Sequence, residues 1–249
     1  MSKTILITGA SSGLGAEMAR QFADLGHDLA LCARRTEKLE TLKAEIHASH
    51  PERRVEVRAL DVNDDAQVFA VFNAFRDDFG TIDRVIINAG VGKGAPLGTG
   101  KYDANRQTAM TNFVAALCQT EAAMEIFRAQ NAGHLVMISS MSAMRGLPKA
   151  QTTYAATKAG VAHLVEGLRL ELLGKPIKVT VLYPGYNVSE MNDVVASETP
   201  MMASTEKGVR AMVSAIEKEK AAACVPPLPW APLSVVMKHA PLPVLRKLL

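Results

Sequence analysis

The sequence contains little of what indicates a disulfide framework or a metal site. Its three cysteines, Cys32, Cys118 and Cys224, are odd in number, far apart and without a Cys-x-x-Cys spacing. They favour a reducing compartment and argue against paired disulfides or a zinc site. The six histidines show no His-x-x-x-His spacing. We therefore predict no metal centre.

Long apolar runs and an excess of charge of one sign are also absent. No run reaches the roughly 18 apolar residues that suggest a membrane span. The 28 basic and 25 acidic residues give a formal net charge of only +3, and no dense basic patch with interleaved aromatics argues for nucleic acid. The chain begins directly with a predicted strand, which leaves no room for a signal peptide. We expect a cytoplasmic protein.

What is present is a regular alternation of strands and helices. Strands are predicted at Lys3–Thr8, Asp28–Ala33, Arg54–Leu60, Arg84–Asn88, His134–Ser140, Ile177–Tyr183 and Ala221–Val225. Helices are predicted from the residues after Gly15 to Gly26, and at Thr36–His47, Asn63–Phe79, Asp103–Gln130, Tyr154–Leu173 and Thr205–Lys220. This alternation predicts an α/β fold, a single doubly wound Rossmann domain with a mainly parallel sheet of about seven strands flanked by helices. The domain would cover residues 1–225, leaving 226–249 as an apolar tail with six prolines.

A glycine-rich turn joins the first strand to the first helix. Glycines at this place let the backbone approach a pyrophosphate lying on the helix N-terminus. The spacing Gly9-x3-Gly13-x-Gly15 differs from the commoner G-x-G-x-x-G, and by itself it is a weak signal. Its position between strand and helix strengthens it. The predicted cofactor contacts here are Gly9, Ser11, Ser12, Gly13, Leu14 and Gly15.

The second strand ends in Cys32-Ala33 and is followed by Arg34 and Arg35. A protein that binds NAD would be expected to carry an acidic residue there for the ribose hydroxyls. Guanidinium groups instead pair with a 2′-phosphate in bidentate fashion, so we predict NADP(H) in preference to NAD(H). The alternative is that both arginines are solvated side chains at a helix start.

Tyr154 and Lys158 are four residues apart within a predicted helix. This spacing places both side chains on one face, one turn apart. A nearby ammonium favours ionisation of the phenol, which suits Tyr154 to general acid–base catalysis.

These motifs resemble the short-chain dehydrogenase/reductase family, in its compact form of about 250 residues. The resemblance covers residues 3 to about 225. Beyond the glycine turn and the Tyr–Lys pair, it includes Asp61-Val62, Asn88-Ala89-Gly90, Asn112, Ser140, Pro184-Gly185 and Ser189. Two departures are Ile87, where the family often has asparagine, and Asn187, where it usually has an apolar residue near the nicotinamide carboxamide.

The resemblance implies a catalytic set of Asn112, Ser140, Tyr154 and Lys158. Tyr154 would exchange a proton with a carbonyl or alcohol as hydride moves, while Ser140 holds the substrate oxygen. Lys158 would bind the ribose hydroxyls of the nicotinamide and favour ionisation of Tyr154, and Asn112 would fix a water. Ser142 is an alternative to Ser140, and Asn112 could instead satisfy a backbone group within its helix. The remaining cofactor contacts implied are Asp61, Val62, Asn88, Ala89, Gly90, Pro184, Gly185 and Ser189.

The loops expected to surround the nicotinamide are apolar and rich in methionine. Their predicted substrate contacts are Met141, Leu147, Tyr186 and Met191. Such a wall is adaptable and short of charge, which favours a lipophilic substrate that is steroid-, retinoid- or acyl-like. The alternative function is a non-catalytic dinucleotide sensor or scaffold of the same fold.

We also expect a homodimer or homotetramer. The apolar tail would dock on a partner subunit or across the pocket mouth, and we favour both over contact with a membrane surface.

Overall fold

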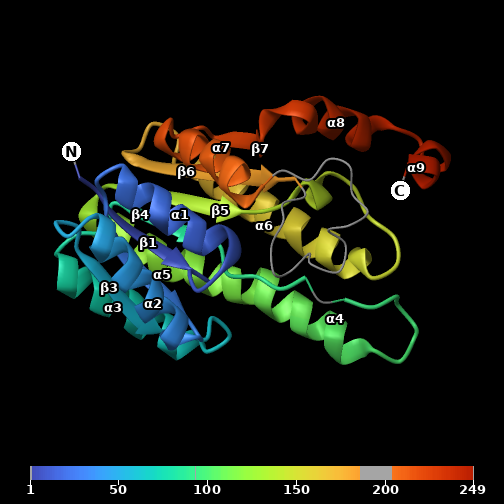
Figure 1. Cartoon of the computed structure of the whole chain (residues 1–249). Coiled ribbons are helices and arrows are strands. Elements are labelled where there is room, and N and C mark those ends of the chain that lie inside the picture. The colour runs from blue at the N-terminus through green and yellow to red at the C-terminus, as the bar shows by residue number, and fades with distance from the viewer. Residues whose placement is uncertain (1, 93, 186–203, 249) are drawn as a thin grey trace.

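The structure, a computed structural model, describes residues 2–92, 94–185 and 204–248 (Figure 1). Within them, 7 strands form one sheet in the order β3-β2-β1-β4-β5-β6-β7, and all neighbouring strands are parallel. The strands are β1 (Thr4–Thr8), β2 (Asp28–Ala33), β3 (Val55–Ala59), β4 (Arg84–Ile87), β5 (Gly133–Ile138), β6 (Ile177–Pro184) and β7 (Ala222–Val225). The predicted α/β doubly wound fold is confirmed.

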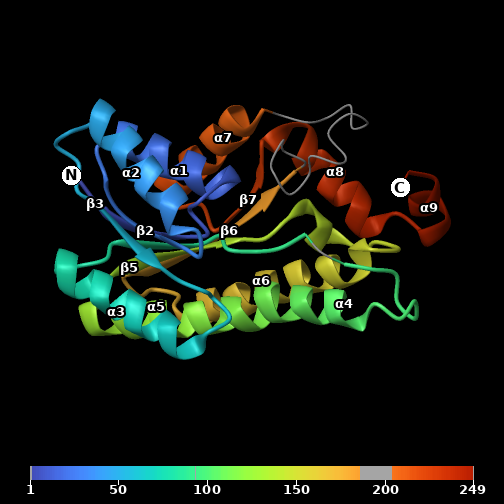
Figure 2. The ribbon, with the colours of Figure 1, turned by 60° about the horizontal axis from the view of Figure 1, so that its bottom comes forward.

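Helices cover both faces of the sheet, as Figure 2 shows. One face carries α1, α2 and α7, and the other carries α3, α5 and α6. The α-helices of the described residues are α1 (Gly13–Asp24), α2 (Thr36–Ser49), α3 (Asp65–Phe79), α4 (Tyr102–Ala109), α5 (Ala115–Gln130), α6 (Gln151–Glu171), α7 (Thr205–Glu217), α8 (Pro227–His239) and α9 (Leu242–Leu248). Because both faces are covered, strands such as β1 are buried along their whole length.

The strand order places the site. The chain leaves β1 toward β2 on one side, and β4 pairs with β1 on the other side. Ligands of open parallel sheets bind where the strand order reverses in this way, outside the carboxyl ends of the strands.

The long helix predicted at Asp103–Gln130 is continuous, but it contains a turn of π-helix. This turn, η1 (Met110–Val114), lies between α4 and α5, and the Ala115 N–H donates to the carbonyl of Met110, five residues earlier. Such turns occur often at functional sites, and η1 contains Asn112. The apolar periodicity used for the prediction gives no signal for one extra residue in a turn.

The tail contains two helices that the sequence analysis did not predict, because it holds six prolines. Leu228 has an extended backbone, so the regular turns of α8 begin after it. Pro229 and Pro232 therefore fall in or next to the first turn, where a missing N–H costs little.

The inner face of α8 buries Trp230 and Met237 against Met141, Leu147 and Ala155. Met141 belongs to the 3-10 helix η2 (Met141–Met144), which follows β5. The tail thus crosses the end of the molecule where the strands end. The division into a domain of residues 1–225 and a tail of 226–249 stays a prediction. Among the described residues, none of the helices is long and apolar enough to cross a membrane.

Candidate active site

A cavity of about 420 Å³ lies at the carboxyl ends of the strands. Gly9 follows β1, Ala33 ends β2, Asn88 follows β4, Ile138 ends β5 and Pro184 ends β6, and all five line the cavity. The cavity therefore occupies the position expected from the strand order.

Most of the predicted site residues come together in this cavity. Those in its lining are Gly9, Ser11, Ser12, Gly13, Leu14, Arg34, Arg35, Asp61, Val62, Asn88, Ala89, Gly90, Ser140, Met141, Tyr154, Lys158, Pro184 and Gly185. Gly15, Asn112 and Leu147 are not part of the lining. Tyr186, Asn187, Ser189 and Met191 lie outside the described residues.

The glycine turn is tightly packed, and its geometry explains the glycines. Gly9 has φ +67°, and a Cβ there would lie 2.9 Å from Ala89 Cα. A Cβ on Gly15 would lie 2.5 Å from the carbonyl oxygen of Gly9. A side chain at Gly9 would therefore push the turn away from the segment after β4, and one at Gly15 would push α1 away from the turn. Gly15 supports the turn from behind, which fits its place outside the cavity lining.

The turn leads into the N-terminus of α1, which faces the cavity with Gly13 as its first residue. All of α1 is described, and its first turn holds no acidic residue that would repel an anion. Backbone N–H groups and the helix dipole at such a terminus favour a phosphate. The residues present thus fit the pyrophosphate of a dinucleotide.

Arg35 lies against the turn. Its guanidinium donates hydrogen bonds to Ser11 Oγ at 3.2 Å and to Ser12 Oγ at 2.6 Å. Arg34 is exposed and also borders the cavity. Two cationic side chains are therefore available where the second strand ends.

Hydrogen bonds between strand ends hold the floor of the cavity. Thr8 Oγ1 accepts from the backbone N–H groups of Asn88, at 3.1 Å, and Ala89, at 3.2 Å. The Asn88 side chain donates to the Thr8 carbonyl at 3.0 Å. On the far side, Asn63 donates to Asp61 Oδ1 and accepts from Thr111 Oγ1, which links the segment after β3 to η1.

Lys158 is buried, only 6% exposed, and its ammonium donates to the Ile138 carbonyl at 2.9 Å. Its Nζ lies 5.8 Å from the centre of the Tyr154 ring. Burial lowers the pKa of Lys158 from 10.5 to about 8, because the charged form loses its hydration. A Cβ on Gly90 would lie 3.6 Å from this Nζ and 3.2 Å from Asn112 Oδ1. A side chain at Gly90 would therefore press on Asn112 rather than on the ammonium.

The three serines after β5 differ in what they contact. Ser139 is buried, and its hydroxyl donates to the Lys158 carbonyl at 2.7 Å, which ties β5 to α6. Ser140 Oγ accepts from the Ser142 N–H at 3.1 Å, and both side chains border the cavity. Ser140 therefore stays a prediction with Ser142 as its alternative.

Asn112 and Asn105 hold the loop that follows β4. Asn112 accepts from the Val91 N–H at 2.8 Å and donates to the Val91 carbonyl at 2.9 Å. Asn105 binds the Ala95 peptide in the same two-sided way, at 3.1 and 3.0 Å. Thr153, next to Tyr154, donates to Asn105 Oδ1 at 3.1 Å.

Asn105 was missed because a buried asparagine in an amphipathic helix looks like any other polar residue in the sequence. Several other residues of the cavity lining were not predicted from the sequence, among them Asn63, Val91, Gly92, Gln107, Thr111 and Gln151. Gln107 and Thr111 are four residues apart and so share one helix face, but neither is three or four residues from Asn112, and the predicted site therefore gave no signal for them.

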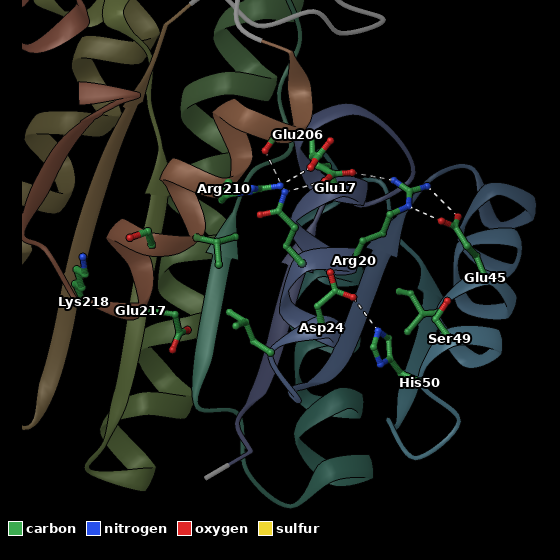
Figure 3. Close-up of a pocket in the computed structure, with 15 residues that line it drawn as sticks. Glu17, Arg20, Asp24, Glu45, Ser49, His50, Glu206, Arg210, Glu217 and Lys218 are labelled. Carbon is green, nitrogen blue, oxygen red and sulfur yellow. Dashed lines mark hydrogen bonds and ion pairs between the residues drawn. The ribbon is translucent and has the colours of Figure 1, made fainter. Parts of the chain in front are cut away.

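A second hollow of about 700 Å³ lies between α1, α2 and α7 and contains none of the predicted site residues (Figure 3). Much of its charge is paired within the lining. Arg20 binds Glu45 at 2.7 Å, His50 contacts Asp24 at 2.8 Å, and Arg210 pairs with Glu206. No group of three or more metal-ligating residues occurs among the described residues. We assign no site there.

Comparison with known proteins identifies the family. A profile described as short chain dehydrogenase matches residues 3–200. An uncharacterized oxidoreductase from Mycobacterium tuberculosis is 54% identical over 233 residues, covering 94% of this chain and 92% of the relative. This chain belongs to the short-chain dehydrogenase/reductase (SDR) family. The resemblance stated from the sequence is confirmed.

Solved structures agree. An SDR from Sphingobium yanoikuyae in complex with NADPH has TM-score 0.83 and 29% identity, covering 94% of this chain and 93% of that one. An SDR from Burkholderia phymatum in complex with NAD shares the fold, with TM-score 0.83, 23% identity and coverage of 94% and 92%. The protein is an NAD(P)-dependent SDR oxidoreductase. The alternative of a non-catalytic protein is therefore set aside.

Proposed function

We propose that this SDR oxidoreductase interconverts a ketone or aldehyde and the corresponding alcohol on a lipophilic substrate, with NADP(H) preferred over NAD(H). The observation that carries the proposal is that Tyr154, Lys158 and Ser140 share one cavity with the glycine turn and two arginines. A bound nicotinamide would supply or accept the hydride. The chain itself must then handle one proton and position the oxygen.

Tyr154 is the group proposed to move that proton. Its phenol would donate to the carbonyl oxygen in reduction and take the proton back in oxidation. The buried Lys158 ammonium lies near the ring, and its charge acts strongly because little water surrounds it. Ser140 would donate a hydrogen bond to the substrate oxygen. Asn112 would position this end of the site by holding Val91.

Replacing Tyr154 tests the proposal. We expect Tyr154→Phe to abolish turnover of a lipophilic ketone, followed by NADPH absorbance, while NADPH binding stays within about two-fold, because only the hydroxyl is removed. The matched control is Tyr102→Phe, since Tyr102 is exposed outside the cavity. Turnover retained by the Tyr154 variant would refute the mechanism.

The cofactor preference is proposed on the two arginines. Arg35 hydrogen-bonds to the serines of the turn, and Arg34 borders the same cavity. We expect Arg34→Ala and Arg35→Ala to weaken NADPH binding about ten-fold or more and NADH binding much less, because only NADPH carries the 2′-phosphate. Arg106→Ala, an exposed residue outside the cavity, should change neither. Equal losses for both cofactors would contradict the preference.

The lipophilic substrate is proposed on the apolar character of the loops. Met141 borders the cavity, whereas Leu147 is buried beneath α8. A steroid-, retinoid- or acyl-like carbonyl suits such surroundings better than a sugar or a small acid. A homodimer or homotetramer and a cytoplasmic location also stay predictions.

A further inference from the structure

The tail has an unusual balance of charge. Residues 226–249 contain no Asp or Glu, yet they include Lys238, His239, Arg246 and Lys247. The two elements against which α8 packs, β7 and η2, contain no acidic residue either. The last turn of α8 is held by another basic side chain, because the Arg145 guanidinium donates to the Lys238 carbonyl at 2.9 Å.

The inner face of the tail is already occupied by its own chain. Trp230, Met237 and Leu245 are buried. The inner face of the tail therefore packs on its own chain without a partner, and only the outer face is left exposed.

That outer face is apolar. Five large side chains on α8 and α9 are between 47% and 75% exposed, namely Leu228, Val235, Val236, Leu242 and Val244. Exposed apolar residues scattered singly are normal, but five of them on two consecutive helices indicate a contact surface. Lys238 and Arg246 are exposed in the same two helices. The surface thus combines apolar side chains with positive charge.

The sequence alone favoured a partner subunit or the pocket mouth over a membrane as the contact of the tail, and the charge of the exposed face reverses this preference. A two-fold contact between two copies of this chain through the tail would join two identical surfaces, and each would carry Lys238 and Arg246. Without acidic residues in the tail to pair with them, this contact would be repulsive. An anionic lipid surface accepts apolar side chains and attracts basic ones.

We propose that the outer face of α8 and α9 docks on the surface of an anionic lipid bilayer. The segment before α4 lies at the same end of the molecule as α9 in both views (Figures 1 and 2). This segment and the start of α4 add Leu97 and Tyr102, which are 67% and 72% exposed. Lys101 and Asp103 are both exposed beside them, so this part contributes apolar surface and no net charge. This end of the molecule lies on the same side as the carboxyl ends of the strands, where the cavity is. Docking would therefore turn the cavity side of the enzyme toward the lipid.

The test measures sedimentation of the full chain with vesicles, without any substrate, so its result does not depend on the proposed function. We expect binding to vesicles of phosphatidylcholine with phosphatidylglycerol, weaker binding at high salt, and none to phosphatidylcholine alone. The variant Lys238→Gln/Leu242→Ser should lower the partition about 25-fold, about five-fold for each residue. Both side chains are exposed, so the fold should tolerate the changes.

The control is Lys175→Gln/Leu170→Ser. It also removes one exposed lysine and one exposed leucine, but at the C-terminal end of α6 and just after it, near the amino ends of the strands. Equal loss in both variants would show mere attraction of a weakly basic protein and overturn the proposal, as would failure of the unmodified chain to bind anionic vesicles. A tail variant that changes the molar mass in light scattering but not vesicle binding would instead assign the surface to a second copy.

Discussion

The buried charge of Lys158 should lower the stability of the cofactor-free protein, so a variant without this charge should be more stable. The side chain is buried, and its pKa falls from 10.5 to about 8. At about 1.4 kcal/mol per pKa unit, burial of the ammonium costs about 3 kcal/mol at pH 7. Methionine has a similar shape without the charge, but it leaves the Ile138 carbonyl without this donor, at a cost of about 1 kcal/mol. Lys158→Met should therefore stabilise the protein by about 2 kcal/mol at pH 7.

The sign of the pH dependence follows from the same shift. Because the pKa of Lys158 is lower in the folded than in the unfolded chain, the unfolded chain binds more protons between pH 8 and 10.5. The penalty is fully present below pH 8 and fades as the pH rises through this window. The advantage of Lys158→Met should therefore disappear near pH 10.

Urea denaturation of the cofactor-free protein at pH 7 and pH 10 measures the effect, provided that the slopes of the transitions are equal. The control Lys175→Met removes an exposed ammonium and should change stability by less than about 0.5 kcal/mol. A Lys158→Met variant that is less stable than the unmodified chain by the same amount at both pH values would refute the reasoning.

Two further predictions concern residues that position the site. Asn105→Ala removes the buried hydrogen-bond partner of the Ala95 peptide. We expect the free energy of unfolding to fall by about 1–3 kcal/mol and the KM for ketones to rise, while NADPH affinity stays unchanged. A change in NADPH affinity alone would contradict this. Thr8→Val keeps the shape but leaves two backbone N–H groups after β4 without their acceptor, which should lower the free energy of unfolding by about 2–4 kcal/mol; an unchanged urea midpoint would disprove it.

The sequence predicted those features that depend on local pattern. Buried β-branched runs and helical periodicity reveal the order of strands and helices, and this order leaves few topologies for a parallel sheet. The strand order then brings Gly9, Asn88 and Pro184 to one edge although they are far apart in the chain. The Tyr154–Lys158 pair was visible because both residues lie within one turn of a single helix.

Features that depend on contacts between distant segments were not visible. The π-turn at Met110–Val114 adds one residue to a helical turn and leaves the apolar pattern almost unchanged. The tail helices were missed because proline is a poor helix former, and only the position of Pro229 and Pro232 at the start of α8 makes them tolerable. The partner of Asn105 is a backbone peptide in a loop, and no pattern of side chains encodes that.

The burial of Lys158 links the stability of the chain to its chemistry. An ammonium in water would act weakly on a phenol several ångströms away, because the high dielectric constant screens its charge. In the cavity Lys158 is held by Ile138 and surrounded by protein, so its field at Tyr154 is much stronger. The same loss of hydration lowers the pKa of Lys158 and destabilises the fold. A variant that relieves the destabilisation must therefore also lose the field, and stability and proton transfer at this site are expected to change in opposite directions.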